Sequence, residues 1–149
     1  MIRGIYRKLG FTLVEILVAV SIIALVAAIG IPNLIRAKHN ASETAAITGL
    51  KSISVACASF FSAQTPPAYP ANLSILGSTV PPYLDNSLTG AVSPATARQG
   101  YFYTYNRISS IQFTCTATPA VPGRTGTRVF FVDESGILKL NNASGPPVE

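Results

Sequence analysis

The sequence predicts an α+β protein in which a long N-terminal helix, apolar first and amphipathic later, packs on a small antiparallel sheet. Three features predict this fold. Residues 11–35 form an apolar run with a single charge, residues 36–63 continue with apolar side chains at helical spacing, and residues 101–140 alternate between apolar and polar types. A chain of 149 residues suits one compact domain with one appendage.

The apolar run reads FTLVEILVAVSIIALVAAIGIPNLI and is long enough to cross a membrane. About 20 helical residues span a bilayer core. An ordinary signal anchor, a secretory signal cut near Val26-Ala27-Ala28 and a buried helix are the alternatives. None of them explains Glu15, the only charge in the run. A carboxylate inside an apolar span is costly, so its presence indicates a function.

Most of the net positive charge lies before this run. The chain is 48% hydrophobic and 11% charged, against about 25% charged in a typical soluble domain. Removing Arg3, Arg7 and Lys8 from the 11 basic residues leaves eight against six acidic residues, so the net charge falls from +5 to +2. The basic N-terminus predicts a cytoplasmic start with the remainder outside. Arg36 and Lys38 weaken this bias without reversing it.

The composition argues against several functions. The sequence has one histidine, two cysteines and no CxxC pair, so we expect no metal, no cofactor and no catalytic triad. We therefore expect a protein that is not an enzyme. No basic stripe interleaved with aromatics indicates nucleic-acid binding. Four arginines are expected in solvent at strand and loop ends: Arg98, Arg107, Arg124 and Arg128.

The string Gly10-Phe11-Thr12-Leu13-Val14-Glu15, after a basic leader and before an apolar run, resembles the processing motif of type IV prepilins and pseudopilins. The resemblance is specific over residues 1–40 and only general in the rest. It implies that a membrane aspartyl peptidase cuts after Gly10 and methylates the new amine of Phe11. It also implies that Glu15 acts in filament assembly.

The chemistry of these positions fits that resemblance. A small Gly10 lets a peptidase approach the backbone closely. Phe11 is a large apolar first residue that stays in lipid or among packed helices. Methylation blocks a proton position on the new amine but keeps its positive charge, and Glu15 of a neighbouring chain supplies an opposite charge.

Pro32 is the second unusual residue of the run. Proline inside a helix removes the hydrogen bond to the carbonyl of Ala28 and costs about 3 kcal/mol. A plain kink, common in membrane helices, is one interpretation. The family resemblance implies another, local melting when subunits pack in a filament. The family often has a glycine midway along the span, where this chain has Ala24.

The second half of the helix is expected to receive the sheet. Its apolar side chains recur every three or four residues and form one stripe: Ile47, Leu50, Ile53, Cys57 and Phe60, with Phe61 beside them. Gln64-Thr65-Pro66-Pro67 is expected to end the helix. Residues 64–100 are predicted to be a long surface connection with one short helical turn near Asn72–Leu76.

Four strands are predicted after this connection, in two hairpins. They cover Tyr101–Ile108, Ile111–Ala117, Val129–Asp133 and Ile137–Leu140. Alternation in the second strand directs one set of side chains inward: Ile111, Phe113, Cys115 and Ala117. Since Cys57 lies on the helix face that meets the sheet, we predict a Cys57–Cys115 disulfide outside the cytoplasm. Two buried thiols are the alternative.

These features divide the chain into a leader (1–10), a transmembrane and filament-core helix (11–35) and an exported head (36–149). The resemblance implies a structural subunit of a type IV pilus-like filament at the cell surface. Its expected partners are copies of itself, membrane lipid, the prepilin peptidase and methyltransferase, and an inner-membrane assembly platform with its ATPase. A pseudopilin of a type II secretion system and a secreted domain with an ordinary signal peptide are the two alternatives.

Overall fold

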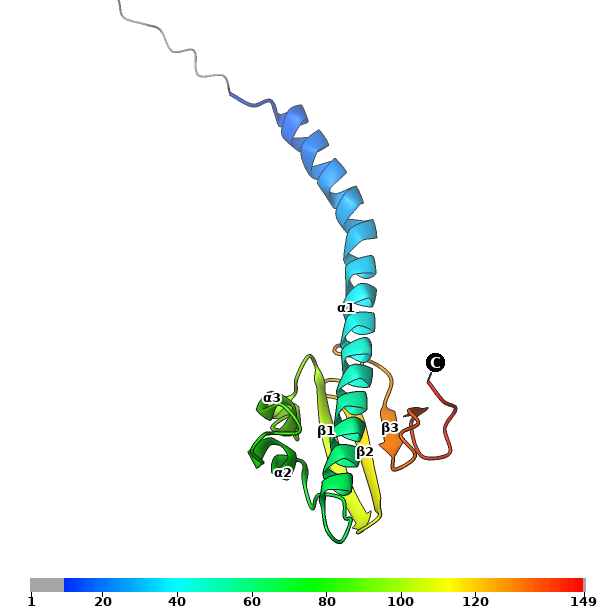
Figure 1. Ribbon diagram of the computed structural model, residues 1–149. Coiled ribbons are helices and arrows are strands. Elements are labelled where there is room, and N and C mark those ends of the chain that lie inside the picture. The colour runs from blue at the N-terminus through cyan, green and yellow to red at the C-terminus, as the bar shows by residue number, and fades with distance from the viewer. Residues whose placement is uncertain (1–9, 149) are drawn as a thin grey trace, which may run out of the picture. The chain divides into compact units, whose positions relative to one another are not determined.

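The computed structural model describes residues 10–148 and has the α+β fold that the sequence predicts. The leader residues 1–9 lie outside the described part of the chain. Helix α1, Leu13–Ala63, comes first, and a four-stranded sheet follows later in the chain (Figure 1). The chain divides into two compact units, Met1–Arg36 and Ala37–Glu149.

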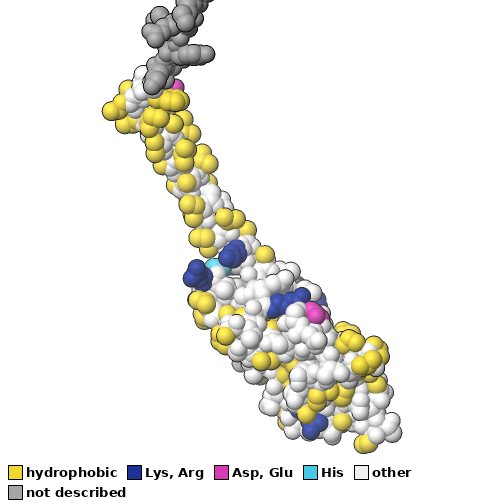
Figure 2. Space-filling view, turned by 90° about the vertical axis from the view of Figure 1, so that its left-hand side faces the viewer, with side chains coloured by type: hydrophobic (Ala, Val, Ile, Leu, Met, Phe, Trp, Pro, Cys, Tyr) yellow, Lys and Arg dark blue, Asp and Glu magenta, His cyan; other side chains and the backbone are white. Residues whose placement is uncertain are grey.

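The first unit contains the apolar part of α1. Over 18 residues of this helix the mean hydropathy reaches 2.7, and none of these residues is buried. Figure 2 shows hydrophobic side chains along this segment. In composition and length this helix can cross a membrane. The helix continues through Pro32 without a break, so local melting at this residue stays a prediction.

The second unit contains the sheet. Its strands are β1 (Tyr101–Ser109), β2 (Gln112–Pro119), β3 (Phe130–Asp133) and β4 (Lys139–Leu140). They pair antiparallel in the order β1-β2-β3-β4, as two consecutive hairpins predict. β4 is shorter than expected, because Ile137 and Leu138 belong to the connection after the β3 turn.

The core of the second unit lies between α1 and the sheet. Leu50, Ile53 and Cys57 are fully buried, which confirms the predicted helical stripe, and Ile47 and Phe60 are partly buried beside them. The sheet contributes Tyr101, Tyr103, Phe113, Cys115, Ala117, Phe130 and Val132. Burying one large aliphatic side chain stabilises a fold by about 1.5–3 kcal/mol. This contact therefore holds the second half of α1 in the head.

Two expectations about the head are wrong. Ile111 is 61% exposed because it lies in the β1–β2 turn, before β2 begins at Gln112. Residues 64–100 are more than a surface connection, because they form α2 (Leu73–Ser78), α3 (Asn86–Thr89) and the short 3-10 helix η1 (Pro94–Thr96). This segment supplies five core side chains: Leu73, Leu76, Leu84, Leu88 and Ala91. The helical turn expected near Asn72–Leu76 is confirmed as α2.

Cys57 and Cys115 come together in this core. Both are fully buried, as expected, and both are free thiols in the structure. Burial raises the pKa of the Cys57 thiol to about 12 and also raises the pKa of Cys115. Tyr105 lies opposite Cys115 in the β1–β2 register, and its hydroxyl donates to the Pro70 carbonyl at 2.8 Å. The structure does not contain the disulfide, which stays a prediction for the exported protein.

We expect the two cysteines of protein purified from the cell envelope without reductant to resist alkylation even in urea. A bridge closing a loop of roughly 60 residues stabilises by about 4 kcal/mol in the chain-entropy model. Mass spectrometry after alkylation in urea counts the free thiols. Two labelled cysteines would show that the pair acts only as small buried side chains.

Candidate processing and assembly site

Gly10 and Phe11 lie just before α1 and are exposed. The peptide bond between them is therefore open to another protein. A side chain added at Gly10 would meet no other atom within 4 Å, and the backbone there has no left-handed φ angle. Nothing in the described part of the chain thus demands a glycine at this position. A requirement for glycine here would come from a partner that approaches the backbone.

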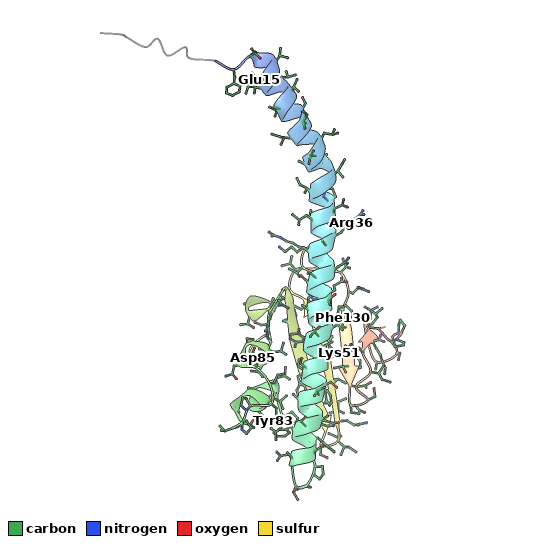
Figure 3. The ribbon with its side chains drawn as sticks, turned by 45° about the horizontal axis from the view of Figure 1, so that its top comes forward. Glu15, Arg36, Lys51, Tyr83, Asp85 and Phe130 are labelled. Atoms are coloured by element: carbon green, nitrogen blue, oxygen red, sulfur yellow. The ribbon has the colours of Figure 1, made fainter. Side chains whose placement is uncertain are left out.

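Glu15 lies in the first turn of α1 (Figure 3). Its backbone N–H donates to Thr12 Oγ1 at 3.2 Å, and the Ile16 N–H donates to the Thr12 carbonyl at 3.3 Å. Thr12 therefore caps the helix two residues after the expected cut. The Glu15 carboxylate stands at the positive end of the helix dipole, and no residue in the described range 10–148 forms an ion pair with it.

A second carboxylate of α1, Glu43, is buried in the head and was missed by the sequence reasoning. Its Oε1 accepts from the Thr127 N–H at 3.1 Å, the Thr127 hydroxyl at 3.2 Å and the Arg128 N–H at 3.3 Å. Its Oε2 accepts from Arg128 Nε at 2.7 Å and Nη2 at 2.6 Å. One side chain thus ties the loop before β3 to α1.

The balance of forces keeps Glu43 ionised. Burial raises its pKa, but the hydrogen bonds from Thr127 and Arg128 and the guanidinium charge outweigh burial, so the pKa lies below its ordinary value. The Arg128 guanidinium also lies 5.6 Å from the centre of the Phe130 ring. Arg128 is exposed just before β3, as expected, but its guanidinium also pairs with Glu43.

Arg98 is exposed, as expected, and its Nη1 also pairs with Asp85 Oδ2 at 3.3 Å. The sequence did contain a signal for Glu43. This residue is three positions before Ala46 and seven before Leu50, which extends the apolar stripe of α1 toward the N-terminus. A carboxylate on an apolar stripe needs a partner.

Comparison with known proteins supports the interpretation of the N-terminal region. The family described as the prokaryotic N-terminal methylation motif matches residues 5–31. The type IV major pilin protein PilA of Myxococcus xanthus (strain DK1622) is 45% identical over 56 residues, which cover 38% of this chain. The match spans 26% of that relative's length. No solved structure matches.

Residues 10–148 form an α+β fold with one membrane-length helix, and the chain matches the methylation motif over residues 5–31. This chain is thus similar, over part of its length, to the methylation-motif family and to a type IV major pilin.

We expect Glu43→Gln to lower the free energy of unfolding by about 2 kcal/mol, because hydrogen bonds to a charged group are worth about 1.5–3 kcal/mol. Folding lowers the Glu43 pKa, so its contribution is complete above the unfolded pKa and is lost as pH falls through the folded pKa. Thermal unfolding of the mature chain in detergent across the acid range measures both effects.

The matched control is Asp85→Asn, which removes the carboxylate of an exposed ion pair and should change stability little. The Glu43 variant should also show a flatter loss of stability in acid than the parent chain. Equal stability of the Glu43 variant and the parent above neutral pH would contradict the structural role of this carboxylate.

Proposed function

We propose that this chain is the structural subunit of a type IV pilus-like filament, stored in the membrane and polymerised through residues 11–35. One observation carries the proposal. The helical segment from Leu13 to Ile35 exposes every one of its large apolar side chains, and its first turn holds one carboxylate. So large an apolar surface is stable only under lipid or under other copies of the chain.

Processing would prepare this segment for assembly. A prepilin peptidase would cut after Gly10, and N-methylation would modify the amine of Phe11. The exposure of both residues and the match to the methylation motif support this step. The modified amine keeps its positive charge at the positive end of a helix dipole, where a cation is unfavourable. It therefore needs a nearby anion.

Glu15 of an adjacent subunit would supply that anion. Opposite charges attract more strongly in an apolar, low-dielectric setting than in water. One carboxylate and one amine from different chains would also fix the axial register of each added subunit. Pairing would offset the cost of about 2.5–3.5 kcal/mol that a carboxylate brings to a membrane span.

The head would then face the outside of the cytoplasmic membrane, where an assembly platform and its ATPase would extract the subunit into the filament. The basic leader and the apolar run support this orientation. A type II secretion pseudopilus would use the same chemistry for a shorter periplasmic filament. The pilin name of the relative favours the pilus.

The mature N-terminus tests the proposal. We expect mass spectrometry of the membrane-extracted protein to find a chain that begins with N-methylated Phe11. Gly10→Val should leave the uncut precursor in the membrane, because a branched side chain blocks close approach to the backbone. Electron microscopy of cells should show filaments that contain this chain. A chain that begins at Ile29 would instead identify an ordinary signal peptide and overturn the proposal.

Glu15→Ala separates assembly from processing, because it leaves Gly10 and Phe11 in place. We expect normal cutting, accumulation of mature protein in the membrane and a loss of nearly all filaments. Immunoblots of membrane and sheared-filament fractions measure both outcomes. Ser21→Ala is the control, since it removes a polar group from the same segment without a charge.

Co-expression of the parent chain should return some Glu15→Ala subunits to filaments, because each contact needs one carboxylate and one amine from different chains. Abundant filaments made only of the Glu15→Ala chain would refute the assembly role.

A further inference from the structure

A groove with both polar and apolar lining runs between α1 and the segment from residue 83 to residue 103 of the head. It has two adjoining parts of about 370 Å³ and 600 Å³, and Thr48, Ser52, Leu88 and Arg98 line both. Small-molecule sites in proteins commonly have volumes of about 300–1,000 Å³. The groove belongs entirely to the second unit and plays no part in the proposed processing or assembly.

Tyr103 opens its hydroxyl into this groove. The residue is 2% exposed, yet its Oη has no hydrogen-bond partner among residues 10–148. The neighbouring inward tyrosines do have partners, since Tyr101 Oη donates to the Arg128 carbonyl and Tyr105 Oη to the Pro70 carbonyl, each at 2.8 Å. Every fully buried side-chain N or O atom of residues 10–148 has a partner, so the Tyr103 Oη must be accessible from the groove. The Tyr103 hydroxyl is thus a free donor at the base of a groove.

The backbone makes room for this hydroxyl at Gly49. A Cβ at this position of α1 would lie 2.1 Å from Tyr103 Oη. Burial also raises the pKa of Tyr103 to about 12, so the hydroxyl keeps its proton in neutral solution.

A row of hydroxyls on α1 forms one wall. Thr44, Thr48 and Ser52 each donate to the carbonyl four residues earlier, at 2.9, 3.0 and 3.0 Å. Their hydrogens are occupied, so their exposed oxygens can only accept from a ligand. Four helical residues advance about 6 Å, which sets the spacing along the row. A ligand for this wall must carry several O–H or N–H donors.

The other groups of the groove favour an anion with an apolar face. One guanidinium nitrogen of Arg98 pairs with Asp85, and its other N–H groups remain available as donors. Lys51 is exposed and forms no ion pair within residues 10–148. Together with Asp85 these side chains give the groove a net charge of +1. Tyr83, 37% exposed, and Val55, 67% exposed, add apolar surface at the same groove. Figure 3 shows Lys51 on α1 and Tyr83 and Asp85 on the neighbouring segment.

We propose that this groove binds a hydroxylated carboxylate such as a uronic acid, free or as a unit of an anionic polysaccharide. The ligand hydroxyls would donate to the row on α1, and its carboxylate would accept from Arg98, which lines both parts of the groove. Tyr103 in one part and Lys51 in the other would supply further donors to the ligand. A peptide that binds by adding a strand fits less well, because it needs a free strand edge. Here the Tyr103 N–H donates to the Ala91 carbonyl at 2.7 Å, and the Arg98 N–H donates to the Tyr101 carbonyl at 2.8 Å.

Isothermal titration of the full mature chain in detergent tests the proposal. Trigalacturonic acid should bind, whereas maltotriose, which has the hydroxyls without the charge, should bind at least tenfold more weakly. Tricarballylate, which has the charge without the hydroxyls, should also be at least tenfold weaker. Polygalacturonate should bind more tightly per chain than the trimer if the source is a polymer, and equally per unit if it is a free sugar acid.

Tyr103→Phe should weaken trigalacturonate binding about five- to tenfold, the value of one hydrogen bond. It should leave the thermal midpoint unchanged, because the hydroxyl has no partner to lose. Tyr69→Phe removes a tyrosine hydroxyl outside the groove and should leave binding unchanged. Thr48→Val removes one acceptor of the row and should also weaken binding.

Three results would overturn the proposal. One is no binding of trigalacturonate at millimolar concentration, and another is equal binding of maltotriose. The third is tighter binding of an acidic peptide, which would assign the groove to a protein segment. Each of these results leaves filament formation by the parent chain unaffected, so it does not bear on the proposed function.

Discussion

The burial of one face of α1 against the sheet is the contact on which the head depends. Leu50, Ile53 and Cys57 fill the space between α1 and the sheet, and the segment between residues 73 and 89 adds leucines to the same core. Every other contact of the head is built around this layer. Gly49 allows β1 to approach the helix closely, because a side chain there would overlap the Tyr103 ring.

The same helix carries two carboxylates, of which one has an ion-pair partner within residues 10–148 and the other has none. Glu43 is surrounded by donors from the loop before β3, and its charge is satisfied within the chain. Glu15 has no ion-pair partner within residues 10–148, and its neighbours along the helix are apolar and exposed. A buried charge is stable when it is paired, and an unpaired charge in an apolar span is costly. This contrast makes Glu43 a structural residue and leaves Glu15 available for the proposed contact with another chain.

The inner face of the sheet shows a similar contrast among its tyrosines. Tyr101 and Tyr105 bind backbone carbonyls of distant loops and so fasten those loops to the sheet. Tyr103, between them, turns its hydroxyl to a groove lined by the hydroxyls of α1. The Tyr101 and Tyr105 hydroxyls therefore stabilise the fold, and the Tyr103 hydroxyl remains available to bind a ligand.

The sequence by itself determined the membrane-length helix, the processing motif, the stripe at Leu50, Ile53 and Cys57 and the two hairpins. Each of these is a local pattern of hydrophobicity or turn residues, and such patterns fix an element wherever it packs. Only the tertiary structure decided the rest.

The core contribution of residues 73–91 was hidden because its leucines are spaced irregularly and become a core only against α1 and β1. The bond from Glu43 to Arg128 and the groove at Tyr103 each join residues more than 50 positions apart. No local pattern encodes which polar groups meet across such a distance, because that depends on how the helix and sheet pack.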